Sequence, residues 1–424
     1  AKVEALPEVA TVHIVNEYER PEVKPDMITS NGMVQAEQTW GDYGFAGEGT
    51  VVAVIDSGID PEHRDYKITD AKTAELTQSE VNQAITSFGL PGEYVNEKVP
   101  YAYNYYDEND DIKDDSPGAS MHGQHVSGTV AANGDLENGG IKGVAPEAQI
   151  LGLKVFSNDP NYASTYGDIY IKAIDDAIKL GADVINMSLG STAGFVDADS
   201  PEQQAVQRAV DNGIFMSISA GNSAYFGHGF DLPTASNPDT GVVGAPSVSQ
   251  ASTSVASLEN DQIQLDAFRV GDEKIGWKKQ DGPAFKEGTY DIVSVGDGQP
   301  ENYEGKDVKG KLVLAVRDGG YFYSQIQKTA EAQGAAGVIV RGAVGHGDYV
   351  SMALDQPQIP MASLSIQDGN ELKDKLADGP LQVTFAGDRI SVNNRSAGAM
   401  SDFTSWGVTP NLDFKPELSA PGGQ

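Results

Sequence analysis

The chain has 424 residues, enough for two or three compact units rather than one. It carries 62 acidic against 29 basic side chains, a formal net charge of −33 with no basic tract to offset it, which argues against nucleic acid as a partner. The absence of cysteine excludes disulfides, thiol catalysis and thiolate metal sites, and no run of 18 apolar residues marks a membrane-spanning helix.

The first predicted elements are two extended segments. Residues 1–27 alternate apolar and polar side chains before a proline-punctuated linker, a pattern that fits an edge strand. Residues 50–55 contain a continuous apolar run, which predicts a strand buried on both faces of a parallel sheet. Asp56 follows this strand directly. An aspartate there either caps the next turn or belongs to a site, because ligands gather at the carboxyl ends of such strands.

A helix-like segment at 79–87 and an acidic stretch come next. The acidic side chains are Asp107, Glu108, Asp110, Asp111, Asp114 and Asp115. Clustered carboxylates can bind structural calcium, although the spacing matches no EF-hand. We favour a solvated acidic loop, and the sequence defines no metal ligands.

Strands and helices then alternate. We expect helices over residues 122–132, 165–180 and 201–212, and strands over residues 149–155, 184–187 and 214–219. The helix at 165–180 has its apolar side chains on one stripe, and Pro201 suits a first helical position. Repeated βαβ units predict an α/β fold with a doubly wound parallel sheet.

A nucleotide-binding fold shares this alternation, so its motifs have to be checked. Dinucleotide sites need GxGxxG between the first strand and its helix. The strand at 50–55 runs instead into DSGIDPEH, with one early glycine and a proline, and GAVGHG at 342–347 lacks the GK[ST] ending of a phosphate-binding loop. The sequence therefore argues against nucleotide binding.

The pattern changes between residues 261 and 395. We expect strands over residues 311–316 and 337–341 there, and a helix over residues 323–333. Sequence like that of the segment before residue 261 resumes at Met400. An insertion in a surface loop costs the host fold little, because closure entropy grows slowly with loop length. We therefore predict a separate inserted domain.

Six motifs together carry a family resemblance. They are DSGID (56–60), HGQHVSGT (122–129), GVAPEAQILGLKVF (143–156), GADVINMSLG (181–190), SAGNS (219–223) and SDFTSWGVTPNLDFKPELSAPGG (401–423). Their order, with the Asp before the His, resembles the subtilisin-like serine proteases. The spacing and wording are most similar to the lactocepin and C5a-peptidase-like cell-envelope proteinases of Gram-positive bacteria. The resemblance extends over nearly the whole chain.

The resemblance implies a role for each polar residue of the motifs. His122 is expected to be the general base, and Asp56 to hold its imidazole in the right tautomer. Asn222 is expected to donate its amide to the oxyanion. His125, about one helical turn beyond His122, is expected to pack inward, and His63 to be structural. The chemistry requires no cofactor.

Substrate contacts are implied by two further motifs. Ser188, Leu189 and Gly190 resemble the segment that pairs with extended substrate, and Ala220 and Gly221 precede Asn222 in the same turn. A polypeptide substrate would then bind as an added β-strand, with its side chains alternating into pockets.

Four domain segments follow from the resemblance. Residues 1–28 resemble a propeptide tail, although an edge strand of the mature protein is the alternative. Residues 29–260 form the first part of a subtilisin-like catalytic domain. Residues 261–395 resemble an inserted, mainly β protease-associated domain, and residues 396–424 form the second part of the catalytic domain.

The nucleophile is the main departure from the family pattern. Relatives carry the serine in a GTSMA motif shortly after APG, and only Gln424 follows Gly423 here. We expect the serine beyond residue 424, or on a second chain, and expect this fragment alone to be inactive. The resemblance implies a secreted or cell-envelope location, with cell-wall attachment through further C-terminal modules. An inactive binding or decoy protein of the same fold is the alternative.

Overall fold

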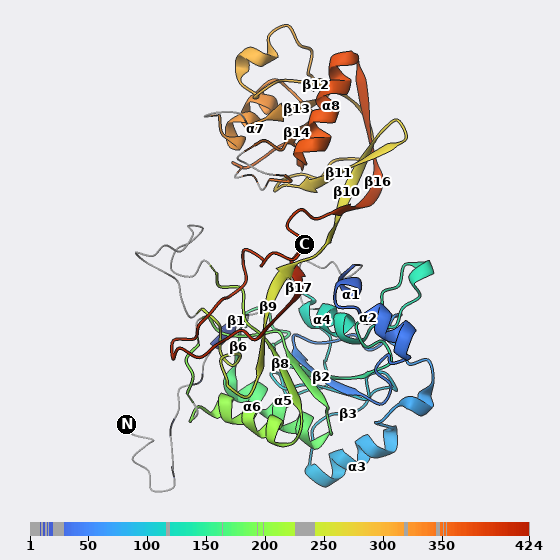
Figure 1. Cartoon of the computed structure of the whole chain (residues 1–424), viewed down its shortest axis with the longest axis vertical. Coiled ribbons are helices and arrows are strands. Elements are labelled where there is room, and N and C mark those ends of the chain that lie inside the picture. Colours follow the sequence, from blue (N-terminus) through green and yellow to red (C-terminus); the bar gives the residue numbers. More distant parts are fainter. Residues whose placement is uncertain are drawn as a thin grey trace. The chain divides into compact units, whose positions relative to one another are not determined.

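The computed structural model describes two compact units. The described residues are 9, 12, 15, 17–19, 29–115, 119–162, 164–192, 194–197, 199–224, 242–317, 321–344, 348–350, 352 and 354–423. The first unit combines residues 1–261 with residues 395–424, and the second contains residues 262–394 (Figure 1).

An eight-stranded sheet forms the centre of the first unit. Its order is β17-β9-β8-β7-β2-β5-β4-β3, and every neighbouring pair is parallel except β3 with β4. The strands are β2 (Val51–Asp56), β3 (Glu93–Tyr94), β4 (Tyr101–Asn104), β5 (Gln149–Lys154), β7 (Val184–Met187), β8 (Phe215–Ser219), β9 (Thr253–Glu259) and β17 (Leu418–Gly423). The carboxyl ends of the parallel strands therefore lie at one edge of the sheet.

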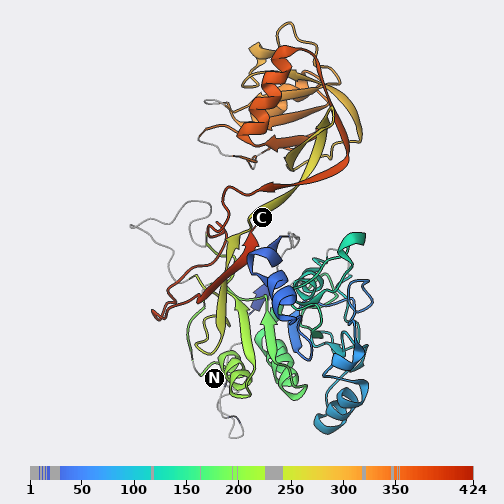
Figure 2. The same cartoon turned by 45° about the vertical axis from the view of Figure 1, so that its right-hand side comes forward.

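Helices cover both faces of this sheet, as the side chains of β2 show. Val51, Ala53 and Ile55 belong to a core with buried alanines of α5 (Gly167–Lys179) and α6 (Pro201–Asp211). Val52 and Val54 belong to a second core, which includes Ala131 of α4 (His122–Ala131). Alternate residues of a strand point to opposite faces, so the two cores lie on opposite sides. Figures 1 and 2 agree in placing α5 and α6, in green, side by side.

Shorter elements complete the first unit. They are α1 (Ser30–Met33), α2 (Ala36–Gln38), α3 (Gln78–Phe88) and short helical turns at Thr39–Tyr43, Ala71–Thr73 and Leu136–Asn138. The capping box of α3 explains its sharp start, because Thr77 and Glu80 bond each other's backbone N–H groups.

A separate two-stranded sheet involves the N-terminal segment. β1 (Glu17–Glu19) pairs antiparallel with β6 (Ser164–Tyr166). Tyr18 is fully buried, and its hydroxyl lies 2.9 Å from the hydroxyl of Tyr170 in α5. Most of residues 1–28 lies outside the described residues.

In its described residues, the second unit is a closed seven-stranded barrel with two helices. Its order is β10-β11-β15-β14-β13-β12-β16, closed by pairing of β16 with β10. The strands are β10 (Gln262–Val270), β11 (Glu273–Lys279), β12 (Gly288–Ser294), β13 (Leu312–Val316), β14 (Gly337–Arg341), β15 (Met361–Leu364) and β16 (Leu381–Asn393). The helices are α7 (Tyr323–Ala332) and α8 (Ile366–Asp378), and a short helical turn spans Pro300–Tyr303.

Backbone bonds within the first unit join the two segments that flank residues 262–394. The Glu259 N–H donates to the Ala399 carbonyl (2.8 Å), and the Glu259 carbonyl accepts from the Gly398 N–H (3.0 Å). The Ser401 N–H donates to the Ser257 carbonyl (3.0 Å). We call this pairing of residues 257–259 with residues 398–401 the neck.

The strands and helices predicted between residues 50 and 341 are confirmed, with ends that differ by at most two residues, whereas most of the extended segment predicted over residues 1–27 lies outside the described residues. β7 and β14 have the predicted bounds, and α4 ends one residue earlier than predicted. The elements that were not predicted are β3, β4, β6, β9, β10, β11, β12, β15, β16, β17, α1, α2 and α8. None of the helices in the described part of the chain is long and apolar enough to cross a bilayer.

Candidate active site

Asp56 and His122 lie in direct contact at the carboxyl edge of the sheet. Asp56 ends the central strand β2 and is 1% exposed. His122 is the first residue of α4, and its Nδ1 lies 2.7 Å from Asp56 Oδ1. The same oxygen accepts from the Ser57 N–H at 2.7 Å. The aspartate therefore orients the imidazole through Nδ1, and Nε2 takes no part in this contact.

A glycine allows this close approach. A Cβ on Gly123 would lie 2.4 Å from the Gly58 carbonyl oxygen, a distance that backbone atoms cannot relieve without movement. Gly58 itself has a φ of +132°, which residues with a side chain rarely adopt. Gly128 differs, because a Cβ there would make only ordinary contacts, the nearest at 3.7 Å. Close packing of the backbone therefore requires a glycine at position 123 but not at position 128.

A second layer of hydrogen bonds surrounds the pair. Ser57 Oγ donates to Asp114 Oδ2 at 2.8 Å and accepts from the Gly123 N–H at 3.0 Å. Asp114 Oδ2 also accepts from the Met121 N–H at 3.0 Å. Sequence reasoning missed both residues as parts of the site. The available signals were a serine directly after Asp56 and an acid shortly before His122.

Asn222 lies at the same edge of the sheet. It follows β8, which is separated from β2 by β7 alone. Its turn is held by Ser405, whose N–H donates to the Gly221 carbonyl (2.7 Å) and whose Oγ accepts from the Ser223 N–H (3.0 Å). The Asn222 side chain is exposed, as a donor to substrate has to be. Its predicted contact with an oxyanion stays a prediction.

The predicted substrate segment, residues 188–190, follows β7. This strand lies between β2, which ends at Asp56, and β8, which precedes Asn222. Ser188 Oγ accepts from Asn186 Nδ2 at 3.1 Å, whereas Leu189 is buried. Ala220 is fully buried, and its N–H and carbonyl both bond to neighbouring backbone, at Val255 and Gly244. Ala220 therefore shapes the core under the turn, while the backbone of 188–190 is placed beside Asp56.

The other two histidines near the site have structural surroundings. Burial lowers the pKa of His125, and the neighbouring His122 adds to this effect, so His125 stays neutral at physiological pH. His63 Nδ1 accepts from the Asp65 N–H at 3.2 Å, and its ring packs edge-on against Tyr66.

One carboxylate of the acidic stretch, that of Asp107, already accepts hydrogen bonds from other residues of this chain. Burial raises the pKa of Asp107, but hydrogen bonds from Ser157, Asn158 and Asn104 outweigh it and leave this pKa below its usual range. Within the described ranges, no three His, Asp or Glu side chains are arranged to hold a metal ion. The calcium interpretation stays a prediction.

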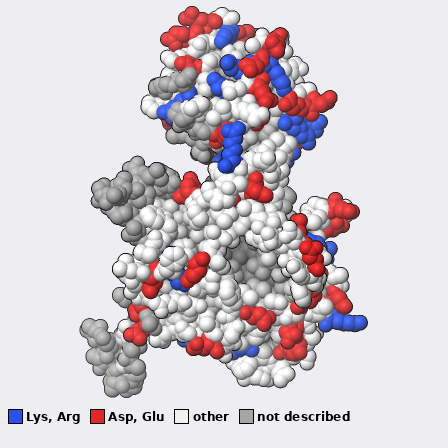
Figure 3. All heavy atoms as spheres, in the orientation of Figure 1, with Lys and Arg blue, Asp and Glu red and all other residues white. Residues whose placement is uncertain are grey.

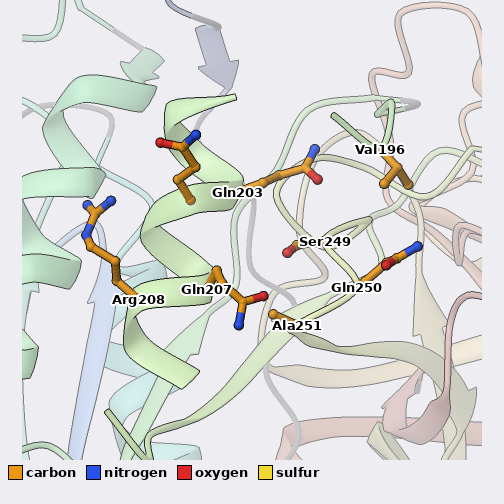
Figure 4. A pocket seen from close by; sticks show the side chains of 8 residues that line it. Val196, Gln203, Gln207, Arg208, Ser249, Gln250 and Ala251 are labelled. Carbon is orange, nitrogen blue, oxygen red and sulfur yellow. The ribbon is translucent and has the colours of Figure 1, made fainter. Parts of the chain in front are cut away.

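A cavity elsewhere on the first unit, of about 590 Å³, is separate from these residues. It lies between α6 and residues 249–251, and Figure 4 shows the glutamine side chains that line it. Its one cation, Arg208, is already paired with Asp175 at 2.8 Å. None of the residues that line this cavity is Asp56, His122 or Asn222.

Acidic side chains predominate around the first unit. Figure 3 shows them scattered over one face of this unit, where basic side chains are few. Such a surface repels anionic polymers and favours solubility.

Comparison with known proteins identifies the family. Residues 47–424 match the Subtilase family model, Peptidase_S8, so the chain belongs to the subtilase family. It is 37% identical over 444 residues to the PII-type proteinase of Lactococcus lactis subsp. cremoris, covering 100% of this chain and 23% of that protein. It is 33% identical over 388 residues to the C5a peptidase of Streptococcus pyogenes, covering 89% of this chain and 32% of that protein.

These relatives confirm the resemblance predicted from the motifs. The chain spans about a quarter to a third of their length. Among solved structures, the subtilisin-like protease Apa1 from the Antarctic psychrotroph Pseudoalteromonas sp. AS-11 has a TM-score of 0.47 at 19% identity, covering 86% of this chain and 84% of that chain. Family membership rests on the sequence match.

Proposed function

We propose that this chain is the larger part of the catalytic region of a secreted serine endopeptidase that hydrolyses polypeptides. The observation that carries the proposal is the 2.7 Å contact between His122 Nδ1 and Asp56 Oδ1 at the carboxyl edge of the sheet. Membership of the subtilase family and the proteinase and peptidase relatives support it.

In the proposed mechanism, His122 Nε2 removes the proton of a serine hydroxyl as its oxygen attacks the scissile carbonyl. Asp56 stabilises the imidazolium that forms, and Asn222 donates its amide to the oxyanion. The imidazolium then protonates the leaving amine, and water hydrolyses the acyl-enzyme. Substrate binds in extended form along the backbone of 188–190.

The nucleophilic serine is proposed in the segment that follows β17 in the complete proteinase, or on a second chain. β17 runs parallel to β9, so its carboxyl end points to the edge that carries Asp56 and Asn222. This chain aligns with only 23% and 32% of the two relatives, which leaves room in them for that segment and for cell-wall attachment modules.

We also propose identities for the remaining segments. Residues 1–28 act as the tail of a propeptide, which the pairing of β1 with β6 supports. Residues 262–394, a barrel of their own, act as an inserted protease-associated domain. The cell-envelope location is inferred from the Gram-positive relatives.

The proposed function is tested by His122→Ala in the complete proteinase, the polypeptide that includes the serine segment. Casein cleavage is expected to fall by about 10⁴-fold or more, because the variant lacks the imidazole that removes the serine proton in the proposed mechanism. His63→Gln is the matched control, since His63 lies in the loop after β2 without contact to Asp56 in the described structure, and it is expected to keep activity. Undiminished cleavage by His122→Ala refutes the assignment and favours a binding protein with the same fold.

A further inference from the structure

We propose that Asp114 is a positioning residue, whose carboxylate fixes His122 against Asp56 through Ser57. The inference rests on the proposed function and adds a residue to the site. Asp114 belongs to the acidic stretch before α4, yet it is 2% exposed, whereas its neighbour Asp115 is exposed. A buried carboxylate is costly unless hydrogen bonds satisfy it. The partners of Asp114 are therefore informative.

One oxygen of Asp114 joins both halves of the site. Oδ2 accepts from Ser57 Oγ at 2.8 Å and from the Met121 N–H at 3.0 Å. Ser57 follows Asp56 in the chain, and Met121 precedes His122. The carboxylate thus bonds the neighbours of both members of the pair at once.

Ser57 bonds to the residue that follows His122. Its Oγ accepts from the Gly123 N–H at 3.0 Å, while its own N–H donates to Asp56 Oδ1 at 2.7 Å. The residues before and after His122 are therefore both tied to one Asp114–Ser57 unit. The backbone that carries His122 cannot move away from Asp56 without breaking at least one of these bonds.

The backbone before α4 shows what the carboxylate holds in place. Met121 has a φ of 56°, a left-handed conformation that costs a non-glycine residue about 1 kcal/mol or more. Its N–H is directed to Asp114 in that conformation. The hydrogen bond offsets the strain at the residue that sets where α4 begins.

The direction of the Ser57 hydroxyl has an electrostatic effect as well. Because Ser57 Oγ donates to Asp114, its proton is not given to Asp56. Asp56 Oδ2 is buried, and no described group donates to it. The negative charge of Asp56 is therefore available mainly to His122, which forms the charge-assisted hydrogen bond.

The first test compares Asp114→Leu with Asp114→Asn in the complete proteinase. Leucine removes the acceptor, and we expect kcat to fall by about 100-fold with KM changed by less than about twofold, because misplacement of a catalytic group by about 1 Å has that effect. Asparagine can place an oxygen where Oδ2 lies and is expected to recover most of that loss. Asp115→Leu is the matched control, expected to leave kcat unchanged.

The second test uses Ser57→Ala, alone and with Asp114→Leu. If the two residues act as one unit, the double variant loses no more kcat than the Asp114→Leu variant. Additive losses overturn the proposal. It is also overturned if folded Asp114→Leu retains kcat within about twofold of the parent, or if the loss falls on KM alone.

A spectroscopic test needs no peptidase activity and uses the 424-residue chain. A proton shared between His122 Nδ1 and Asp56 resonates at low field in the ¹H NMR spectrum, outside the amide region. The proposal expects this signal in the parent and in Asp114→Asn, and its loss in folded Asp114→Leu. A signal unchanged in Asp114→Leu contradicts the proposal. This result is independent of His122→Ala kinetics, so the positioning role and the proposed function fail separately.

Discussion

At the scale of single residues, sequence motifs predicted the pair but not its support. Asp56 and His122 stand out because each opens or closes an element with small residues beside it. Asp114 does not stand out, because it is one of two consecutive aspartates in an acidic stretch, and the other, Asp115, is exposed. Only the fold brings Ser57 to Asp114 and buries one of the two acids.

The contrast between two glycines of α4 gives a prediction at this scale. Gly123→Ala places a methyl group against the backbone of Gly58, so α4 has to move and the contact between His122 and Asp56 is expected to lengthen. Proteolytic kcat of the complete proteinase should fall by about tenfold or more. Kinetics on casein, with a thermal unfolding curve of each variant, provide the measurement.

Gly128→Ala is the control for this prediction. It lies on the same helix with room for a methyl group, and it is expected to keep kcat and raise stability by up to about 1 kcal/mol through helix propensity. Equal losses in both variants would show that any added methyl group disturbs α4.

At the scale of elements, periodic segments were predicted and interrupted ones were not. β7 (VINM) and β14 (GVIVR) are short segments rich in β-branched residues, which predict strands without tertiary information. β16 contains the turn-like letters Ala386-Gly387-Asp388, and it extends through them because β10 and β12 pair with it along its length. α8 is mostly polar, with Leu372 and Gly369 as its buried residues, so its apolar stripe is too narrow to recognise.

The pairing of β1 with β6 gives a prediction for elements. Tyr18→Ala removes a fully buried ring, a change that typically costs about 3–5 kcal/mol, so β1 should detach from β6. Hydrogen exchange at the backbone amides of residues 17–19 in the 424-residue chain should then lose its protection. Tyr18→Phe keeps the ring and loses only the hydroxyl bond to Tyr170, and it should retain most protection. Equal protection in the parent and Tyr18→Ala would mean that the ring does not hold the strand.

At the scale of the whole molecule, a mainly β inserted domain was predicted over residues 261–395, and the second compact unit spans residues 262–394, but the closure of its barrel was not predicted. A closed barrel requires β10 to pair with β16, more than 100 residues later in the chain. Strand pairing over such a separation in sequence produces no local sequence pattern from which it could be predicted. The neck was also unpredictable, because its bonds join backbone groups rather than particular side chains.

The neck predicts that the second unit can be removed. Since Glu259 is bonded to Gly398 and Ala399, a linker of about four glycine and serine residues in place of residues 262–394 should close the gap without strain. The shortened chain is expected to unfold cooperatively and to retain the low-field ¹H signal of His122. Calorimetry and NMR of the purified protein provide the measurement. Aggregation or a non-cooperative transition, with normal behaviour of the full 424-residue chain, would show that the first unit depends on the second.

The strand formed by residues 17–19 also has a consequence in terms of mass action. Residues 20–28 link Tyr18 covalently to the rest of the chain. β1 therefore binds the edge of β6 at a fixed effective concentration, whatever the protein concentration. One cut in this link turns the strand into a free peptide that dilution can remove. Occupancy of the β6 edge then depends on intermolecular affinity alone.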